Sequence, residues 1–154
     1  MGEAMNLEIR ACDPDEPEIS RLLEVLSTHL QQVTGRNGKN HFNADEVRSE
    51  GGCFLAAFQD GEAVACGGLR PAGQGEAEVK RFYVARQRCG IGTELMAALQ
   101  DAAKKMGYHI LIVETGKANV GAVAFYRKQG FTVIPNYGVY VGMDTSICFE
   151  REIV

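Results

Sequence analysis

Residues 78–96 read EVKRFYVARQRCGIGTELM, and this stretch decides the fold. Alternating residues over Glu76–Val84 predict a strand, and Gly90 and Gly92 precede an amphipathic helix expected over Thr93–Met106. Glycine lets the backbone turn tightly and removes side chains from the approach path. The free N–H groups and partial positive charge at the start of the helix favour phosphate oxygens. The segment therefore predicts a strand, a glycine turn and a helix that can bind a phosphate group.

This glycine turn does not match two common nucleotide-binding motifs. A dinucleotide fingerprint needs a third glycine where the chain has Leu95. A P-loop needs Gly-Lys followed by Ser or Thr, whereas Gly92 is followed by a Thr-Glu pair. Arg86 and Arg88 add positive charge beside the turn. On the two glycines alone, a phosphate site and a strand–turn–helix corner that binds nothing both stay open.

Working outward, periodicity and turn signals predict the other elements. In chain order these are a strand Asn6–Cys12, a helix that starts at Asp13 and Pro14 with an apolar face to Leu30, a short helix Asn43–Arg48, strands Cys53–Phe58, Glu62–Leu69 and Glu76–Val84, a helix Thr93–Met106, a strand Tyr108–Thr115, a helix from Asn119 or Val120 to Lys128, and strands Phe131–Ile134 and Ser146–Glu150. Meander strands followed by a βαβ crossover predict one α+β, or mixed α/β, domain over residues 1–154.

The composition excludes several classes of partner. The 154 residues carry a net charge of −4, and this argues against nucleic acid, which requires a basic surface. No apolar run approaches the roughly 20 residues of a membrane span, and Met1–Arg10 lacks the pattern of a secretory signal. Five cysteines without a Cys-x-x-Cys pair, and three histidines without ligand spacing, predict reduced thiols and no metal. We therefore expect a cytoplasmic protein without a membrane partner.

Two motifs resemble the GCN5-related N-acetyltransferase (GNAT) superfamily. Gln87–Gly92 is similar to its central signature, Arg/Gln-x-x-Gly-x-Gly/Ala, between a strand and a helix. The stretch AVAFYRKQGF, which ends at Phe131, resembles its second acetyl-coenzyme A motif, and the whole resemblance covers residues 53–150. The chain departs from many members because Val84–Gln87 is short and lacks a proline. This departure leaves open which of Arg86, Gln87 and Arg88 faces the pyrophosphate.

The resemblance implies a mostly antiparallel sheet, flanked by helices, that splits between two parallel strands, Glu76–Val84 and Tyr108–Glu114. It also implies that acetyl-CoA lies in this split as the co-substrate. The implied contacts are backbone groups of Phe82, Tyr83 and Val84 for the pantetheine arm, and Gln87, Arg88, Cys89, Gly90, Ile91, Gly92 and Thr93 for the pyrophosphate.

Further implied roles concern the transfer of the acetyl group to an amine. Tyr126 matches the tyrosine that protonates the departing thiolate, although a helical tyrosine can also simply pack in a core. Asn119 is implied to contact the coenzyme and is a favourable N-cap residue. A backbone N–H near Phe82 is the expected oxyanion donor. Glu78 and Glu114 compete as the general base, with a water chain or a merely salt-bridged carboxylate as the alternatives.

The acceptor is less well defined by the sequence. Period-two counting places Glu78, Lys80 and Phe82 on one strand face and Arg81 on the other. Lys80 and Arg81 are candidates for binding an anionic acceptor, or they lie on a solvated face. Tyr137 and Tyr140 lie in a segment that is a candidate cover of the acceptor site.

Three functions remain open on the sequence. They are an N-acetyltransferase for a small-molecule amine or amino acid, an N-acetyltransferase for protein N-termini or lysines, and a non-catalytic acyl-CoA sensor. Dimers are common in the superfamily, so the resemblance permits a homodimer.

Overall fold

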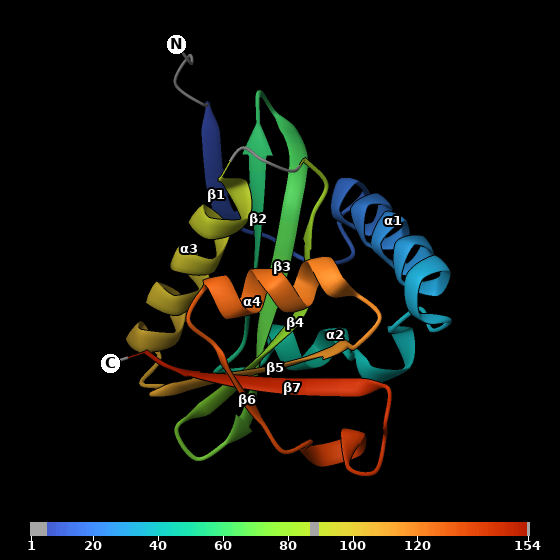
Figure 1. Ribbon diagram of the computed structural model, residues 1–154. Helices are drawn as coiled ribbons and strands as arrows, with labels where there is room; N and C mark the ends of the chain where they lie inside the picture. The colour runs from blue at the N-terminus through green and yellow to red at the C-terminus, as the bar shows by residue number, and fades with distance from the viewer. Residues whose placement is uncertain (1–5, 87–89, 154) are drawn as a thin grey trace.

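The computed structural model describes residues 6–86 and 90–153 of the chain (Figure 1). Within these residues, seven strands form one sheet in the order β1-β2-β3-β4-β5-β7-β6. The strands are β1 (Leu7–Ala11), β2 (Cys53–Gln59), β3 (Glu62–Gly73), β4 (Glu76–Val84), β5 (Ile110–Gly116), β6 (Thr132–Ile134) and β7 (Ser146–Glu152). The helices are α1 (Pro17–Thr34), α2 (Ala44–Arg48), α3 (Ile91–Lys105) and α4 (Val120–Lys128), with short 3-10 turns η1 (Lys39–His41) and η2 (Gly138–Tyr140). The predicted α+β class and order of elements are confirmed.

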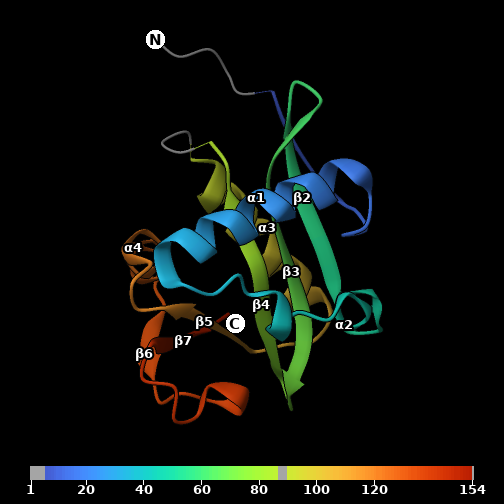
Figure 2. The ribbon, with the colours of Figure 1, turned by 90° about the vertical axis from the view of Figure 1, so that its right-hand side faces the viewer.

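One face of the sheet is covered by α1 and α2, which lie toward the viewer in Figure 2. Ile19 and Leu22 of α1 and Val47 of α2 pack there against Phe54 and Cys66 of the sheet. Burial of these apolar side chains is the main favourable term that holds α1 in place. We call this surface of the sheet the α1 face.

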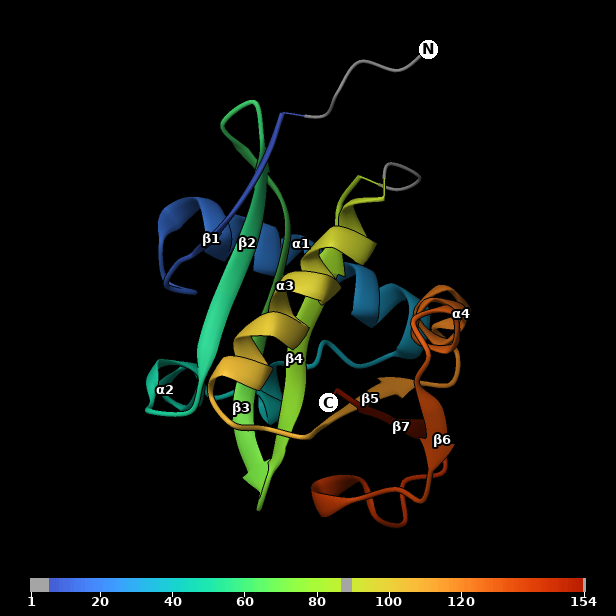
Figure 3. The same ribbon diagram turned by 90° about the vertical axis from the view of Figure 1, so that its left-hand side faces the viewer.

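The opposite face carries α3, which lies toward the viewer in Figure 3, and α4. Leu95 and Leu99 of α3 and Tyr126 of α4 belong to one core cluster with Val79 of β4 and Phe149 of β7. We call this surface the α3 face. Leu111 and Val113 of β5 belong to the same cluster, and Ile112 between them is buried, so both faces of this apolar run are covered.

The sheet splits between β4 and β5. Of the described strand pairs, this pair is parallel and the others are antiparallel. Within the described residues, β4 and β5 pair from Glu76 opposite Ile110 to Glu78 opposite Ile112 and no further. Figure 1 shows β5 and β7 running across the direction of β2 and β3. The split that the resemblance implied is confirmed.

A β-bulge interrupts β4 at this point. Lys80 lies opposite Gly68 and Tyr83 lies opposite Cys66, so two β4 residues oppose one residue of β3. Arg81 is one of these two, and its φ of 54° lies in the left-handed region, which is rare for a residue with a side chain. The bulge bends β4 where it leaves β5.

The bulge corrects the face assignment made by period-two counting. Glu78 and Lys80 line one cavity with Glu46 of α2, and Arg81 binds Ser27 of α1. Phe82 instead stacks on Phe125 of α4. The prediction that Phe82 shares a face with Glu78 and Lys80, opposite Arg81, is therefore wrong. Simple alternation fails because it does not allow for an extra residue in one strand.

Helix α1 begins later than the sequence indicates. Its first residue is Pro17 and its N-cap is Glu16, rather than Pro14 and Asp13. A second proline was available for the first turn, and the Asp13 carboxylate is occupied elsewhere: it accepts a hydrogen bond from the backbone N–H of Asp15 and binds Arg48.

Strand β3 also runs past the predicted end at Leu69 to Gly73, because it stays paired with β4 up to the turn. By contrast, Asn43 caps α2 as predicted.

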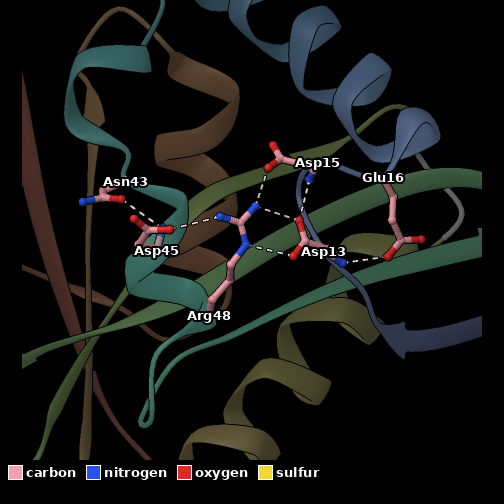
Figure 4. A network of polar contacts seen from close by, with 6 residues as sticks. All are labelled: Asp13, Asp15, Glu16, Asn43, Asp45 and Arg48. Atoms are coloured by element: carbon pink, nitrogen blue, oxygen red, sulfur yellow. Dashed lines mark hydrogen bonds and ion pairs between the residues drawn. The ribbon is translucent and has the colours of Figure 1, made fainter.

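A cluster around Arg48 ties the start of α1 to α2 (Figure 4). The Arg48 guanidinium donates two hydrogen bonds of 2.8 Å to Asp13 and also contacts Asp15 and Asp45. Hydrogen bonding to Arg48 lowers the pKa of Asp13 from 3.8 to about 2. A lowered folded-state pKa stabilises the fold above the unfolded pKa, and this contribution is lost as the pH falls through about 2.

We expect Arg48→Met to weaken the pH dependence of stability. Between about pH 6 and about pH 2.5, wild type should lose more stability than the variant, because the variant lacks the Arg48 hydrogen bonds that contribute most to the lowered pKa of Asp13. Urea midpoints at the two pH values measure the difference, which is small because the groups are exposed. Equal losses in the two proteins would contradict this assignment.

Candidate active site

A cavity of about 550 Å³ lies at the split between β4 and β5. We call it the split cavity. Its walls come from β4 over Val79–Val84, from the end of β5 over Val113–Thr115, from the first turns of α4 and from the inner side of α1. His41 of η1 and Tyr140 of η2 also line it. The cavity therefore occupies the region where β4 and β5 have separated.

The glycine turn forms the start of α3. Gly90 is the N-cap residue with a φ of 72°, and the helix begins at Ile91, two residues before the predicted Thr93. The backbone N–H groups of Ile91, Gly92 and Thr93 thus lie in the first turn, where they have no partner within the helix. Gln87, Arg88 and Cys89 lie outside the described residues. Arg86 pairs with Glu62 at 2.8 Å.

Gly92 has a second reason to be glycine. A Cβ atom at this position would lie 3.1 Å from Phe125 of α4 and 3.2 Å from Val84 of β4. The absence of a side chain thus lets the first turn of α3 approach α4 and the end of β4 closely. The glycine turn and the split cavity are brought together by this contact.

Tyr126 lines the split cavity from α4 and is buried. Its ring packs against Phe82, Phe131 and Phe149, with centroid separations of 6.3, 5.6 and 5.9 Å. Burial, with a smaller effect from the Glu114 carboxylate, raises the pKa of Tyr126 above its usual 10.0, so the phenol stays protonated at neutral pH. Tyr126 is thus both a core residue and a proton-bearing group in the cavity wall.

Asn119 and the end of β4 lie in the same cavity wall. The Asn119 side chain accepts a hydrogen bond of 3.3 Å from the backbone N–H of Ala122, so its predicted role as the N-cap of α4 is confirmed. Phe82, Tyr83 and Val84 also line the cavity, and the Phe82 ring stacks on Phe125 at 5.2 Å.

The two candidate bases lie in different surroundings. Glu114 lines the split cavity, accepts a hydrogen bond of 2.6 Å from Ser146 and lies 4.0 Å from the Arg36 guanidinium. Glu78 is only 1% exposed and lines a neighbouring cavity of about 330 Å³. Its oxygens bind the Arg70 guanidinium at 2.7 and 2.6 Å and the Tyr137 hydroxyl at 2.8 Å. Glu114 therefore faces the split, whereas Glu78 is held in a buried ion pair.

We expect Arg70→Met to destabilise the protein by about 3 kcal/mol, because it leaves the buried Glu78 carboxylate without its main counter-ion. Arg86→Met is the matched control: Arg86 pairs with Glu62 on the surface, with exposed fractions of 44% and 68%, so its loss should cost under about 1 kcal/mol. Urea unfolding of both variants measures the difference. Equal costs would show that burial does not set the strength of the Arg70–Glu78 pair.

Four side chains predicted near the acceptor fall into two groups. Lys80 donates a hydrogen bond of 3.0 Å to the Tyr140 hydroxyl, and Tyr137 donates to Glu78, so β4 holds η2 over the end of the cavity. Arg81 instead binds the carbonyl oxygens of Leu23 and Asn37 and the Ser27 hydroxyl. Arg81 thus fastens α1 and the following loop to the bulge.

Sequence reasoning missed several residues around the cavity. His41 lies in a polar loop with no periodic signal, yet its ring packs edge-on to Tyr140 at 5.3 Å. Arg70 lies directly opposite Glu78 in the β3–β4 pairing, and counting back from the Gly73–Gly75 turn could have found it. The inner side of α1 was expected to be core, whereas Leu26, Leu30 and Val33 also line the cavity.

The fold and the site together define a class: small α+β domains whose central sheet opens between two parallel strands over a cavity. Residues 19–131 match the family model described as the Acetyltransferase (GNAT) family, and the chain belongs to this family. It is an acyltransferase of the GNAT type.

Individual proteins agree with this assignment. The chain is 28% identical to an IAA acetyltransferase of Azospirillum brasilense, over 96% of this chain and 99% of the relative. A structure from Klebsiella pneumoniae, assigned as an acyl-CoA N-acyltransferase, superposes with a TM-score of 0.82 at 24% identity and covers 97% of this chain and 99% of that one. The PaiA N-acetyltransferase of Thermoplasma acidophilum, in complex with coenzyme A, gives a TM-score of 0.73 at 22% identity, covering 96% and 99% of the two chains.

Among the described residues there is neither a helix suited to cross a membrane nor a group of side chains suited to hold a metal ion. Over residues 6–86 and 90–153, none of the helices has both the length and the apolar content needed to cross a membrane. In the same part of the chain, no three His, Cys, Asp or Glu side chains are grouped so as to hold a metal ion.

Proposed function

We propose that this protein is an N-acetyltransferase that moves the acetyl group of acetyl-CoA directly to a primary amine of a small molecule or amino acid. One observation carries the proposal: a protonated phenol, Tyr126, and a carboxylate, Glu114, line the same cavity in the split sheet. Direct transfer needs a group of each kind, one to give a proton and one to take it.

Acetyl-CoA fits the split cavity and the glycine turn. The backbone of Phe82, Tyr83 and Val84 would hold the pantetheine arm, and Asn119 lies beside the same space. The N–H groups of the N-cap Gly90 and of Ile91, Gly92 and Thr93 in the first turn would hold the pyrophosphate. A Cβ atom at Gly90 would meet no atom within 4 Å. Gln87, Arg88 and Cys89 are expected to take part in the same contact. The coenzyme A complex of the Thermoplasma relative supports this choice of co-substrate.

The proposed reaction uses three groups of this chain. Glu114, directly or through a water molecule, removes a proton from the acceptor amine, whose nitrogen then attacks the thioester carbonyl carbon. A backbone N–H near Phe82 stabilises the developing oxyanion. The C–S bond breaks, and Tyr126 gives its proton to the departing thiolate. An acceptor that enters as the ammonium ion loses one proton to Glu114, which releases it to solvent, and a second proton, through water, to the Tyr126 phenolate. The products are an amide, free coenzyme A and one proton, with both side chains restored. Glu78, held by Arg70, is the weaker candidate for the base.

The closed end of the cavity favours a small acceptor over a peptide. Tyr140 is 3% exposed, and its contacts with Lys80 and His41 place η2 across this end. A peptide acceptor would need an open groove at the same place.

The free thiols at Cys12, Cys53, Cys66 and Cys148 agree with the cytoplasmic location that we propose.

The test is thiol release from acetyl-CoA by the purified protein with a panel of small amines, amino acids and peptides. Mass spectrometry identifies the acetylated product, and calorimetry measures acetyl-CoA binding. We expect binding, and thiol release that depends on a small amine. Binding without thiol release from any acceptor would favour the acyl-CoA sensor, and turnover confined to peptides would favour the protein acetyltransferase. Failure to bind acetyl-CoA would overturn the proposal.

A further inference from the structure

A neighbouring cavity of about 330 Å³, with walls from η1, α2, β4 and η2, adjoins the closed end of the split cavity. Lys80, His41 and Tyr140 line both cavities and therefore mark their junction. Because the proposed acetyl-CoA position follows β4 from the bulge toward α3, this junction is where the non-reacting part of an acceptor would lie.

Two carboxylates beside the junction, Glu78 and Glu46, are bound by Arg70. Both oxygens of the buried Glu78 carboxylate are occupied, one by Arg70 and the other by the Tyr137 hydroxyl. The ammonium nitrogen of Lys80 lies 3.8 Å from Glu78, beyond hydrogen-bond distance. Glu46 also binds Arg70, but its side chain is 40% exposed, so water screens its charge. Neither carboxylate therefore accepts a hydrogen bond from Lys80.

Lys80 is the cation with hydrogen-bonding capacity left. Among the residues that the structure describes, its one hydrogen bond goes to the neutral phenol of Tyr140, and an ammonium group has three N–H donors. The side chain is 11% exposed, and burial lowers the pKa of Lys80 below its usual 10.5. Arg81 is already bound to Leu23, Asn37 and Ser27. A buried cation of this kind is stabilised by an anionic ligand.

A carboxylate lines the same cavity as this ammonium group. Glu114 faces the split, and its charge acts on the pKa of Lys80. The walls therefore present a negative group for an amine and a positive group for an anion. A molecule that contains both an amine and an anionic group complements them.

We propose that the acceptor is an amine that also carries a carboxylate, that is, an amino acid or a similar molecule, and that Lys80 binds its carboxylate while Glu114 faces its amine. This inference rests on the acetyltransferase activity proposed above. Tyr140 is a positioning residue here, because it accepts a hydrogen bond from Lys80, and His41 packs against the Tyr140 ring.

The test compares free amino acids with the matching amino-acid amides as acceptors for wild type, Lys80→Met and Lys105→Met. The amide keeps the amine and side chain but removes the negative charge. The amine of the amide is less basic than the amine of the free amino acid, so a larger fraction of it is neutral. An enzyme that does not recognise the carboxylate should therefore acetylate the amide at least as fast as the free amino acid. Lys105 is exposed at the end of α3, so Lys105→Met is the matched control.

In wild type and Lys105→Met, we expect kcat/KM for the acid to exceed that for the amide. Lys80→Met should reduce this ratio about tenfold or more through KM, which is the loss expected for a hydrogen bond to a charged group. Lys80→Arg should restore part of the preference, and acetyl-CoA affinity should stay unchanged in all variants.

Two outcomes would overturn the inference. If wild type releases thiol with the amides as fast as with the acids, the inference fails and the proposed acetyltransferase activity stands. If no amine gives thiol release, both fail. Because the wild-type comparison needs no variant, the result does not depend on whether Lys80→Met folds.

Discussion

Tyr126→Phe is expected to bind acetyl-CoA with unchanged affinity and to lose about 100-fold in kcat, the lower range for removal of a general acid. The ring contacts with Phe131 and Phe149 are kept by phenylalanine. Among the described residues, none forms a hydrogen bond with the Tyr126 hydroxyl, so its removal leaves no described group without a partner and stability should hardly change.

Tyr108→Phe is the matched control. The Tyr108 hydroxyl donates to the Gly51 carbonyl oxygen at 2.6 Å, on a side of the molecule away from the split. We expect this variant to lose about 1 kcal/mol of stability and to keep its kcat. Steady-state kinetics and calorimetry separate the two roles of Tyr126. A kcat of Tyr126→Phe within about threefold of wild type would show that Tyr126 does not supply the proton.

Phe149→Ala is expected to destabilise the protein by about 4 kcal/mol, a large share of the roughly 5–15 kcal/mol that holds a typical domain together. Phe149 is fully buried at the centre of β7 and lies 5.9 Å from the Tyr126 ring. Its removal leaves a cavity directly beneath the proposed proton donor. Turnover should therefore fall together with stability.

Val133→Ala provides the comparison. Val133 of β6 lies opposite Phe149 in the strand pairing but is 49% exposed, so its truncation should cost under about 1 kcal/mol. Urea unfolding measures both variants under the same conditions. A loss below about 1.5 kcal/mol for Phe149→Ala would mean that β7 and α4 close the gap by moving together.

Much of the fold follows from local signals in the sequence. The two glycines place a strand on one side and a helix on the other, and the Asp60-Gly61 pair sets the β2–β3 hairpin. The apolar run in β5 shows that both of its faces are covered. These signals suffice because each depends on a few neighbouring residues.

The site was less predictable because its contacts join distant segments. Glu78 was a candidate base or a salt-bridged carboxylate in the sequence, and only the strand pairing identified Arg70 as its partner. Lys80 and Arg81 are equivalent cations in the sequence, yet one points into the cavity junction and the other holds α1. That difference is produced by a left-handed backbone conformation at Arg81, for which the side-chain pattern gives no sign.

The extra residue in β4 has an evolutionary consequence. Without Arg81, the remaining residues would alternate without interruption, with Val79 and Phe82 on one face and Lys80 and Tyr83 on the other. Such a strand could continue alongside β5 and seal the sheet. The left-handed arginine costs on the order of 1 kcal/mol, and the three partners of its guanidinium offset that strain. On this reasoning, the gain or loss of a single codon at this position would decide whether β4 bends away from β5 or follows it.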